Sequence, residues 1–140
     1  MSAEIEREFV EAFIAKDKKQ RLLDFFVSSK NRWKGLLEIE HFHADIIDAR
    51  YAQRIPRVDS TPEKIVRLLR QRGAASDCYV FSNCKDLDQR FMSLEQAIRE
   101  VHGVGIGTVV SCIHGQLAFY EGELYPDEFI LQRTKAYALP

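Results

Sequence analysis

Residues 78–113 read CYVFSNCKDLDQRFMSLEQAIREVHGVGIGTVVSCI and contain the pattern that decides the fold. Residues 78–82 are apolar on both faces, which is typical of a strand inside a sheet. The capping-box sequence Ser93-Leu94-Glu95-Gln96 predicts a helix over 94–102, and the apolar run 106–113 predicts a second strand. A strand, a helix and a strand in this order predict a right-handed parallel crossover.

Two further strands are expected after this unit, over residues 116–121 and 128–132. His114 and Gly115 supply a turn between the first of them and the strand before it. The last three strands would then form an antiparallel meander, so that the complete sheet is mixed and has about four strands.

Upstream of residue 78 the apolar residues follow a helical spacing. Three amphipathic helices are expected, over residues 4–15, 18–27 and 30–40. The third of them would bury Trp33, Leu36 and Leu37. Because the connections between the three helices are short, they are expected to form an antiparallel cluster.

A fourth helix follows the sequence Ser60-Thr61-Pro62-Glu63, in which Ser60 can cap the first turn, and Gly73 ends this helix. The expected fold is therefore α+β, with an N-terminal three-helix cluster plus a fourth helix packed on a mixed, about four-stranded sheet with one crossover helix. The length of the chain predicts one domain over residues 1–140.

The composition is that of a folded globular protein, since 46% of the 140 residues are hydrophobic and 29% are charged. The chain opens with Glu4, Glu6, Glu8 and Glu11, the opposite of the basic start of a signal peptide. No apolar run approaches the roughly 20 residues that cross a bilayer. With three cysteines, all in the second half, we expect a soluble cytoplasmic protein with reduced thiols and no membrane partner.

Charge is distributed unevenly although the net charge is −1. Residues 16–34 and residues 50–72 each contain seven basic and two acidic residues, whereas residues 73–128 contain three basic and nine acidic ones. Such polarised surfaces favour association with a protein partner or with a second copy of the chain. Since no complete catalytic set is present, the first hypothesis is a noncatalytic protein-binding or regulatory module.

The run His41-Phe42-His43-Ala44-Asp45 places His41, His43 and Asp45 on one face of an extended segment. Imidazole and carboxylate groups are ligands for zinc or a similar ion. The run resembles the opening of the H-x-H-x-D-H motif of metallo-β-lactamase-fold hydrolases, with Ile46 in place of the last histidine. This resemblance implies a metal-dependent hydrolase that uses these three side chains. The alternative, which we favour, is a polar end of the third helix with solvated histidines and no cofactor.

A second candidate is a surface patch beyond the C-terminal end of strand 78–82, consisting of Asn83, Cys84, Asp86, Asp88 and Arg90. Ligand crevices in sheets with parallel strands lie at this edge. Two neighbouring carboxylates can hold a cation or act as an acid and a base. The other interpretation of this segment is a solvated turn that contains an Asp–Arg pair.

Basic residues in the predicted helices suggest a weak nucleic-acid binder as a further alternative. The candidate basic face consists of Lys18, Lys19, Arg32, Arg67 and Arg70. Domains that bind nucleic acid usually have a pI above about 9, whereas the pI of this chain is about 6.4. Nucleic acid is therefore a less favoured partner than protein.

Two remaining patterns are better explained by structure than by chemistry. The glycines at 103, 105 and 107 lie between a helix and a strand, whereas a dinucleotide-binding loop lies between a strand and a helix. Cys112 and His114 lie on the same side of a strand, as a nucleophile and its base would. Cys112 is surrounded by apolar residues, however, which is typical of a cysteine in a core.

Overall fold

A six-stranded sheet forms the middle of the described part of the molecule, in the order β1-β6-β5-β4-β2-β3 with all neighbours antiparallel. The structure is a computed structural model that describes residues 2–41, 46–123 and 127–133. The strands are β1 (Ala52–Arg54), β2 (Asp77–Ser82), β3 (Arg90–Ser93), β4 (Thr108–Ile113), β5 (Leu117–Glu121) and β6 (Glu128–Gln132). The α+β class is confirmed, but the sheet has more strands than expected and is antiparallel rather than mixed.

The predicted parallel crossover is wrong because β3 lies between β2 and the helix α6 (Leu94–Val101). β3 runs back along β2 and pairs Asp77 with Ser93. The amide of Leu94 then donates to the carbonyl of Ser76, just before β2. Because α6 starts beside the beginning of β2 rather than beside its end, β4 returns antiparallel to β2. With only four residues, β3 is too short for strand alternation to stand out in the sequence.

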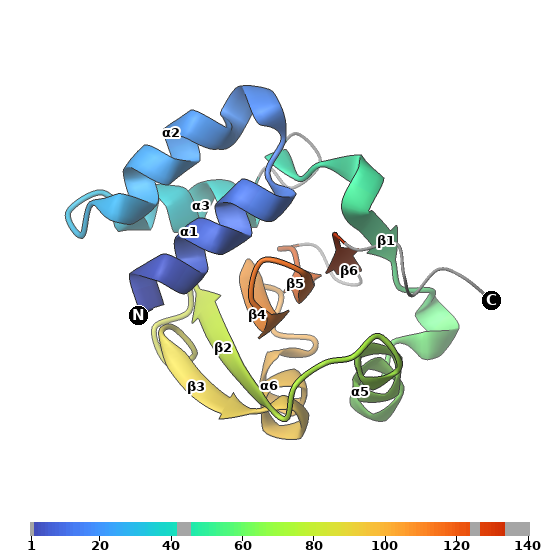
Figure 1. Cartoon of the computed structure of the whole chain (residues 1–140). Helices are drawn as coiled ribbons and strands as arrows, with labels where there is room; N and C mark the ends of the chain where they lie inside the picture. Colours follow the sequence, from blue (N-terminus) through green and yellow to red (C-terminus); the bar gives the residue numbers. More distant parts are fainter. Residues whose placement is uncertain (1, 42–45, 124–126, 134–140) are drawn as a thin grey trace.

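Helices cover both faces of the sheet (Figure 1). The helices on one face are α1 (Ser2–Phe13), α2 (Lys16–Val27) and α3 (Arg32–His41), and those on the other are α5 (Pro62–Gln71) and α6. Two short 3-10 helices, Ala49–Tyr51 and Arg57–Asp59, flank β1. The predicted three-helix cluster and fourth helix are therefore confirmed. Among the described residues, no helix combines the length and the hydrophobicity that crossing a bilayer requires.

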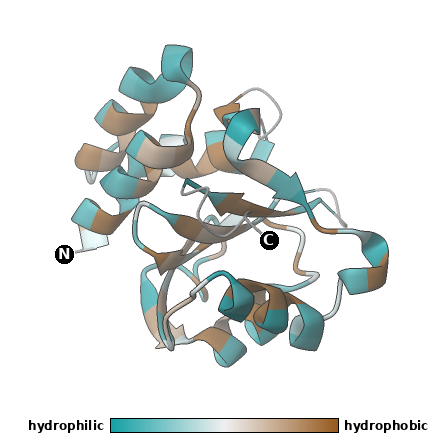
Figure 2. Cartoon of the chain, turned by 45° about the vertical axis from the view of Figure 1, so that its right-hand side comes forward, coloured by the Kyte–Doolittle hydropathy of each residue, from teal (hydrophilic) through white to brown (hydrophobic). Residues whose placement is uncertain are grey.

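The two faces of the sheet have separate hydrophobic cores. On β2, Cys78 and Val80 belong to the core under α5 and α6, whereas Tyr79 and Phe81 belong to the core under α1, α2 and α3. Hydrophobic residues accordingly concentrate in the strands and on the helix sides that face the sheet (Figure 2). The interior position predicted for this strand is confirmed, since β2 lies between β3 and β4.

The helix ends follow the predicted caps with one correction. Ser93 accepts an amide hydrogen bond at 3.2 Å at the start of α6, and Gly73 after α5 has a φ of +95°. The cap of α5, however, is Thr61 and not Ser60, because it is the hydroxyl of Thr61 that accepts an amide hydrogen bond, at 3.3 Å. Ser60 bonds instead to the buried carboxylate of Glu128.

α3 presents a different face to the core from the one predicted. Trp33 and Leu37 are 56% and 36% exposed, so their predicted burial is wrong, whereas Leu36 is buried as expected. Gly35 is also buried, and a Cβ on it would lie 2.6 Å from the ring of Phe26 in α2. Because glycine has no side chain, the Phe26 ring packs directly on the backbone of α3, which turns Trp33 outward.

Candidate functional site

Arg32, the first residue of α3, holds two carboxylates at once. Its guanidinium donates to both oxygens of Glu6 in α1, at 2.9 and 2.7 Å, and to both oxygens of Asp88 after β2, at 2.7 and 2.8 Å. Asp88 also accepts from the amide of Ser82 at 3.0 Å, and the hydroxyl of Tyr79 donates to Glu6 at 2.6 Å. Arg32 therefore ties two helices to the loop that follows β2.

Burial determines the electrostatics of this group. The side chains of Arg32 and Glu6 are only 15% and 2% exposed. Burial by itself would lower the pKa of Arg32, but the hydrogen bonds to Asp88 and Glu6 outweigh it and the pKa is raised. Burial and the hydrogen bond to Glu6 raise the pKa of Tyr79. Arg32 thus remains charged and Tyr79 remains neutral, so the group is a fixed support rather than an acid or a base.

A hollow of about 460 Å³ lies between α3 and the loop that connects β2 to β3. It is lined by Ser29, Arg32, Trp33, Leu36, Ser82, Asn83, Lys85, Asp88 and Gln89, and is named the Trp33 hollow below. Trp33 and Leu36 give it an apolar wall, while the loop gives it polar side chains and the ammonium of Lys85. Its volume falls within the roughly 300–1,000 Å³ of ligand pockets.

The predicted surface patch is divided by this geometry. Two of its members line the Trp33 hollow, Asn83 and Asp88, and three do not, Cys84, Asp86 and Arg90. The side-chain amide of Asn83 donates to Glu40 at the end of α3, at 2.6 Å. Asp88 pairs with Arg32, a residue far away in the sequence, rather than with Arg90 at the start of β3.

Trp33 is the only tryptophan of the chain, and more than half of it is exposed. The ammonium of Lys34 lies 5.8 Å from the Trp33 ring and 6.0 Å from the ring of Phe25 in α2, which is within the range of cation–π attraction. Lys30 and Lys85 are exposed as well. Arg32 offsets one of the two carboxylate charges at the base, and the three exposed lysines outnumber the one that remains, so positive charge dominates around Trp33.

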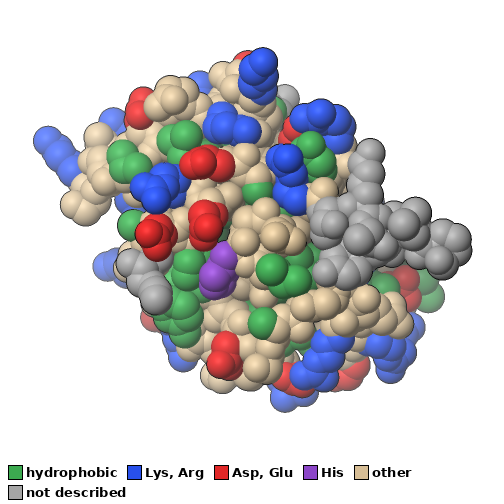
Figure 3. Space-filling model, in the orientation of Figure 1, with side chains coloured by type: hydrophobic (Ala, Val, Ile, Leu, Met, Phe, Trp, Pro, Cys, Tyr) green, Lys and Arg blue, Asp and Glu red, His purple; other side chains and the backbone are tan. Residues whose placement is uncertain are grey.

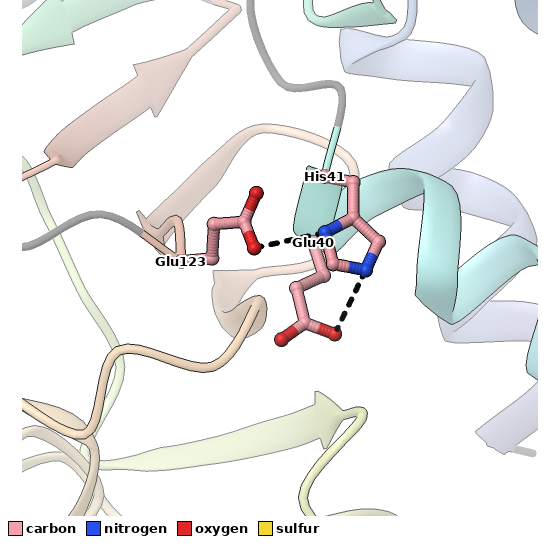
Figure 4. A group of neighbouring side chains, drawn as sticks. All are labelled: Glu40, His41 and Glu123. Atoms are coloured by element: carbon pink, nitrogen blue, oxygen red, sulfur yellow. Dashed lines mark hydrogen bonds and ion pairs between the residues drawn. The ribbon is translucent and has the colours of Figure 1, made fainter.

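A second cluster joins the end of α3 to the residues after β5 (Figure 4). Nδ1 of His41 lies 2.9 Å from Oε2 of Glu123, and its Nε2 lies 4.0 Å from Oε1 of Glu40. One ligand atom from each of these three residues lies within 4.8 Å of the other two. The hydrogen bond that His41 donates to Glu123 raises the pKa of His41. Of the predicted metal ligands only His41 is placed here, since His43 and Asp45 lie outside the described residues.

A third cluster is a pair of buried carboxylates. Glu121 of β5 and Glu128 of β6 are direct partners across the two strands, and neither is exposed to solvent. Glu121 accepts the amide hydrogen bonds of Gly103 and Gly105, at 2.8 and 2.9 Å. The glycine-rich turn therefore binds a carboxylate of its own chain. Burial raises the pKa of Glu121 to about 7, opposed by the two amides and assisted by Glu128.

Ser60 and His102 surround the second carboxylate of this pair. The hydroxyl of Ser60 donates to Oε1 of Glu128 at 2.5 Å, and Nε2 of His102 lies 3.1 Å from this hydroxyl and 3.3 Å from Oε2 of Glu128. In a serine–histidine–carboxylate triad the two ring nitrogens serve different partners. Here the same nitrogen faces both, so this is not the geometry of a triad. Sequence reasoning missed the cluster because its members are far apart in the chain.

The five residues of the candidate basic face lie on opposite sides of the sheet. Lys18, Lys19 and Arg32 belong to α2 and α3, whereas Arg67 and Arg70 belong to α5. Arg32 is engaged by its two carboxylates, and Arg70 forms an ion pair with Glu95. The fold thus divides this set between the two faces of the sheet.

The remaining sequence candidates, Cys112 and His114, lie in different surroundings. Cys112 is buried in the core under α5 and α6. His114 is exposed, its Nδ1 lies 2.7 Å from the hydroxyl of Ser111, and it lines a wide hollow of about 680 Å³ together with Glu8 and Glu11 of α1. Figure 3 shows a face of the molecule on which acidic side chains lie next to a histidine.

Comparison of the chain with models of protein families, with curated proteins and with solved structures finds no match. The proposals below therefore rest on the geometry of the described residues.

Proposed function

We propose that this chain is a noncatalytic binding module that holds an acidic segment of another protein in the Trp33 hollow. The observation that carries the proposal is the exposed position of the only tryptophan at the edge of a preformed hollow. Tryptophan contributes more than most residues to the energy of protein interfaces. Exposed apolar surface bordered by polar groups also marks binding sites.

The base of the hollow supports this proposal because it is rigid. Arg32 makes four hydrogen bonds to two carboxylates, and one of these carboxylates also accepts the amide of Ser82. A site whose side chains are already fixed loses less conformational entropy when a partner binds. The same four bonds keep the guanidinium occupied, so we assign it to support rather than to contact with the partner.

The charge around the hollow favours an acidic partner. Lys30 and Lys34 flank Trp33 along the chain, Lys85 lines the hollow, and all three are exposed. Carboxylates of a partner would face these ammonium groups while an apolar side chain packs on Trp33. Such complementarity mainly accelerates association and selects the partner.

The proposal predicts which peptides the folded chain selects from a random library of twelve-residue peptides. We expect selected sequences to combine Asp and Glu with one aromatic or leucine anchor. Labelled copies should bind with an affinity that falls at least tenfold in Lys85→Glu, because the charge at the hollow is reversed. In Trp33→Ala the loss should reach about 100-fold, the size of an interface hot spot. Fluorescence anisotropy measures both, and the emission of Trp33 in the unmodified chain reports the contact directly.

Arg67→Glu is the matched control, since it makes a comparable reversal of charge on the far side of the sheet and should leave the affinity unchanged. Selected peptides without acidic bias, or binding that survives Trp33→Ala, would contradict the proposal. A single-stranded oligonucleotide that binds at Trp33 more tightly than the peptides, with a steep dependence on salt, would also contradict the proposal. It would identify nucleic acid as the partner instead.

The second candidate function is binding of zinc or a similar ion by Glu40, His41 and Glu123, favoured by the convergence of their ligand atoms. We expect zinc to raise the thermal midpoint at pH 7.5, because a ligand that binds only the folded state stabilises it. The rise should vanish in His41→Ala and persist in His114→Ala, which removes an exposed histidine elsewhere. It should also shrink as the pH falls, because protons compete for the imidazole. A midpoint indifferent to zinc in the unmodified chain excludes this candidate.

A further inference from the structure

Two of the three cysteines lie opposite each other on the central strands β2 and β4. The register between these strands pairs Val80 with Val110 and Tyr79 with Ser111. Cys78 and Cys112 are the next residues beyond the Tyr79–Ser111 pair, one on each strand. Both side chains belong to the core under α5 and α6, with exposures of 1% and 2%. The thiol of Cys112 donates to the carbonyl of Val110 at 3.6 Å.

This placement meets the geometric requirement for a disulfide. Residues directly opposite on antiparallel strands have Cα atoms roughly 4.5–5.5 Å apart, and disulfides span Cα separations of roughly 4.4–6.8 Å. The pairing of β4 with β5 also shifts register between Ser111 and Ile113. Because such a bulge loosens the ladder locally, the backbone at Cys112 can adjust when the sulfurs approach bonding distance.

We propose that Cys78 and Cys112 form a reversible disulfide that links β2 to β4 in the folded chain when a small disulfide oxidant is present. With oxidised glutathione, one protein thiolate attacks a glutathione sulfur and releases one glutathione thiolate. The second protein thiolate then attacks the mixed disulfide and releases the other. Two protein thiols are oxidised, one glutathione disulfide is reduced to two thiols, and two protons move from the protein to the released glutathione.

The surroundings make this pair slow to react but selective. Its contact with Cys78, together with burial, raises the pKa of the Cys112 thiol, which keeps the thiolate fraction small. Cys84 is only half-buried and lies outside the register pair. Cys84 can carry a single glutathione, whereas an adduct on either member of the pair is displaced by the neighbouring thiol. The disulfide would link two neighbouring interior strands covalently and would make the chain between the two cysteines a closed loop.

The test equilibrates the folded chain in glutathione buffers of graded oxidation, traps free thiols with an alkylating agent, and analyses intact mass and linked peptides. We expect the Cys84→Ser variant to lose the mass of two hydrogens and to yield a peptide joining positions 78 and 112. The thermal midpoint should rise by roughly 10 °C on oxidation and return on reduction. Cys112→Ala should show neither change.

Near-ultraviolet circular dichroism verifies that the chain stays folded throughout. Two outcomes overturn the proposal. In the first, Cys78 and Cys112 of the unmodified chain are both still free thiols after equilibration in the most oxidising buffer. Both are then alkylated once the chain is completely unfolded. In the second, the link forms only when denaturant is added or involves Cys84 in place of either partner.

Discussion

Replacement of Arg32 by methionine is expected to lower the free energy of unfolding by about 3–5 kcal/mol, the cost of removing one partner from a buried ion pair. Methionine keeps most of the length of the side chain but leaves Glu6, which is 2% exposed, without its counter-charge. The hydrogen bonds that hold Asp88, and with it the loop after β2, are lost as well. Urea unfolding at pH 7, monitored by circular dichroism, measures the change.

Two further variants separate this effect from a general loss of charge. Arg21→Met breaks the ion pair with Glu38, whose partners are 49% and 20% exposed, and should cost only about 0–1 kcal/mol. Adding Glu6→Gln and Asp88→Asn to Arg32→Met should recover most of the lost stability, because no buried charge is then left unpaired. A cost for Arg32→Met as small as that of Arg21→Met would refute the role assigned to Arg32.

Stability should also fall as the pH rises from about 4.5 to about 7, through the titration of Glu121. Burial raises the pKa of this carboxyl to about 7, whereas its ordinary value is 4.5. Over this range the unfolded chain releases the proton while the folded chain retains it, so ionisation favours unfolding. The stabilisation that the protonated Glu121 contributes is fully present below pH 4.5 and is lost as the pH rises to about 7. It amounts to on the order of 3 kcal/mol.

Comparison with Glu121→Gln isolates this contribution from those of other acids. The difference in unfolding free energy between the variant and the unmodified chain should change by about that amount between pH 4.5 and pH 8, in favour of the variant at high pH. Glu11→Gln, an exposed change on α1, should show a constant difference. A constant difference for Glu121→Gln as well would mean that its carboxyl does not hold a proton in the fold.

Local patterns predicted most of the helices and strands, whereas contacts distant in sequence decided what was missed. The capping box at Ser93 and the helix-ending Gly73 were readable because their partners lie within a few residues. The topology could not be predicted from local patterns, because the four-residue strand β3 reverses the direction of the chain before α6. The same applies to the loop contact of Arg32, whose partner Asp88 lies 56 residues away.

The candidate site was predictable only in part for a related reason. Of the loop residues that the sequence suggested as a patch, Asn83 and Asp88 line the Trp33 hollow. The exposure of Trp33 was not foreseen, because helical spacing cannot reveal that the ring of Phe26 packs on the backbone at Gly35. Nor does any spacing relate Glu121 to Glu128, which meet only through the register of β5 and β6.

The lengths of the two outermost strands affect whether the protein forms fibrils in concentrated solution. β1 has three residues and β3 has four, so each rim of the sheet offers few peptide groups to an incoming chain. Natural proteins shorten such rims to prevent strand-by-strand growth into fibrils. Concentrated solutions of the folded protein should accordingly resist fibril formation, since the long strands that could template it are enclosed on both sides.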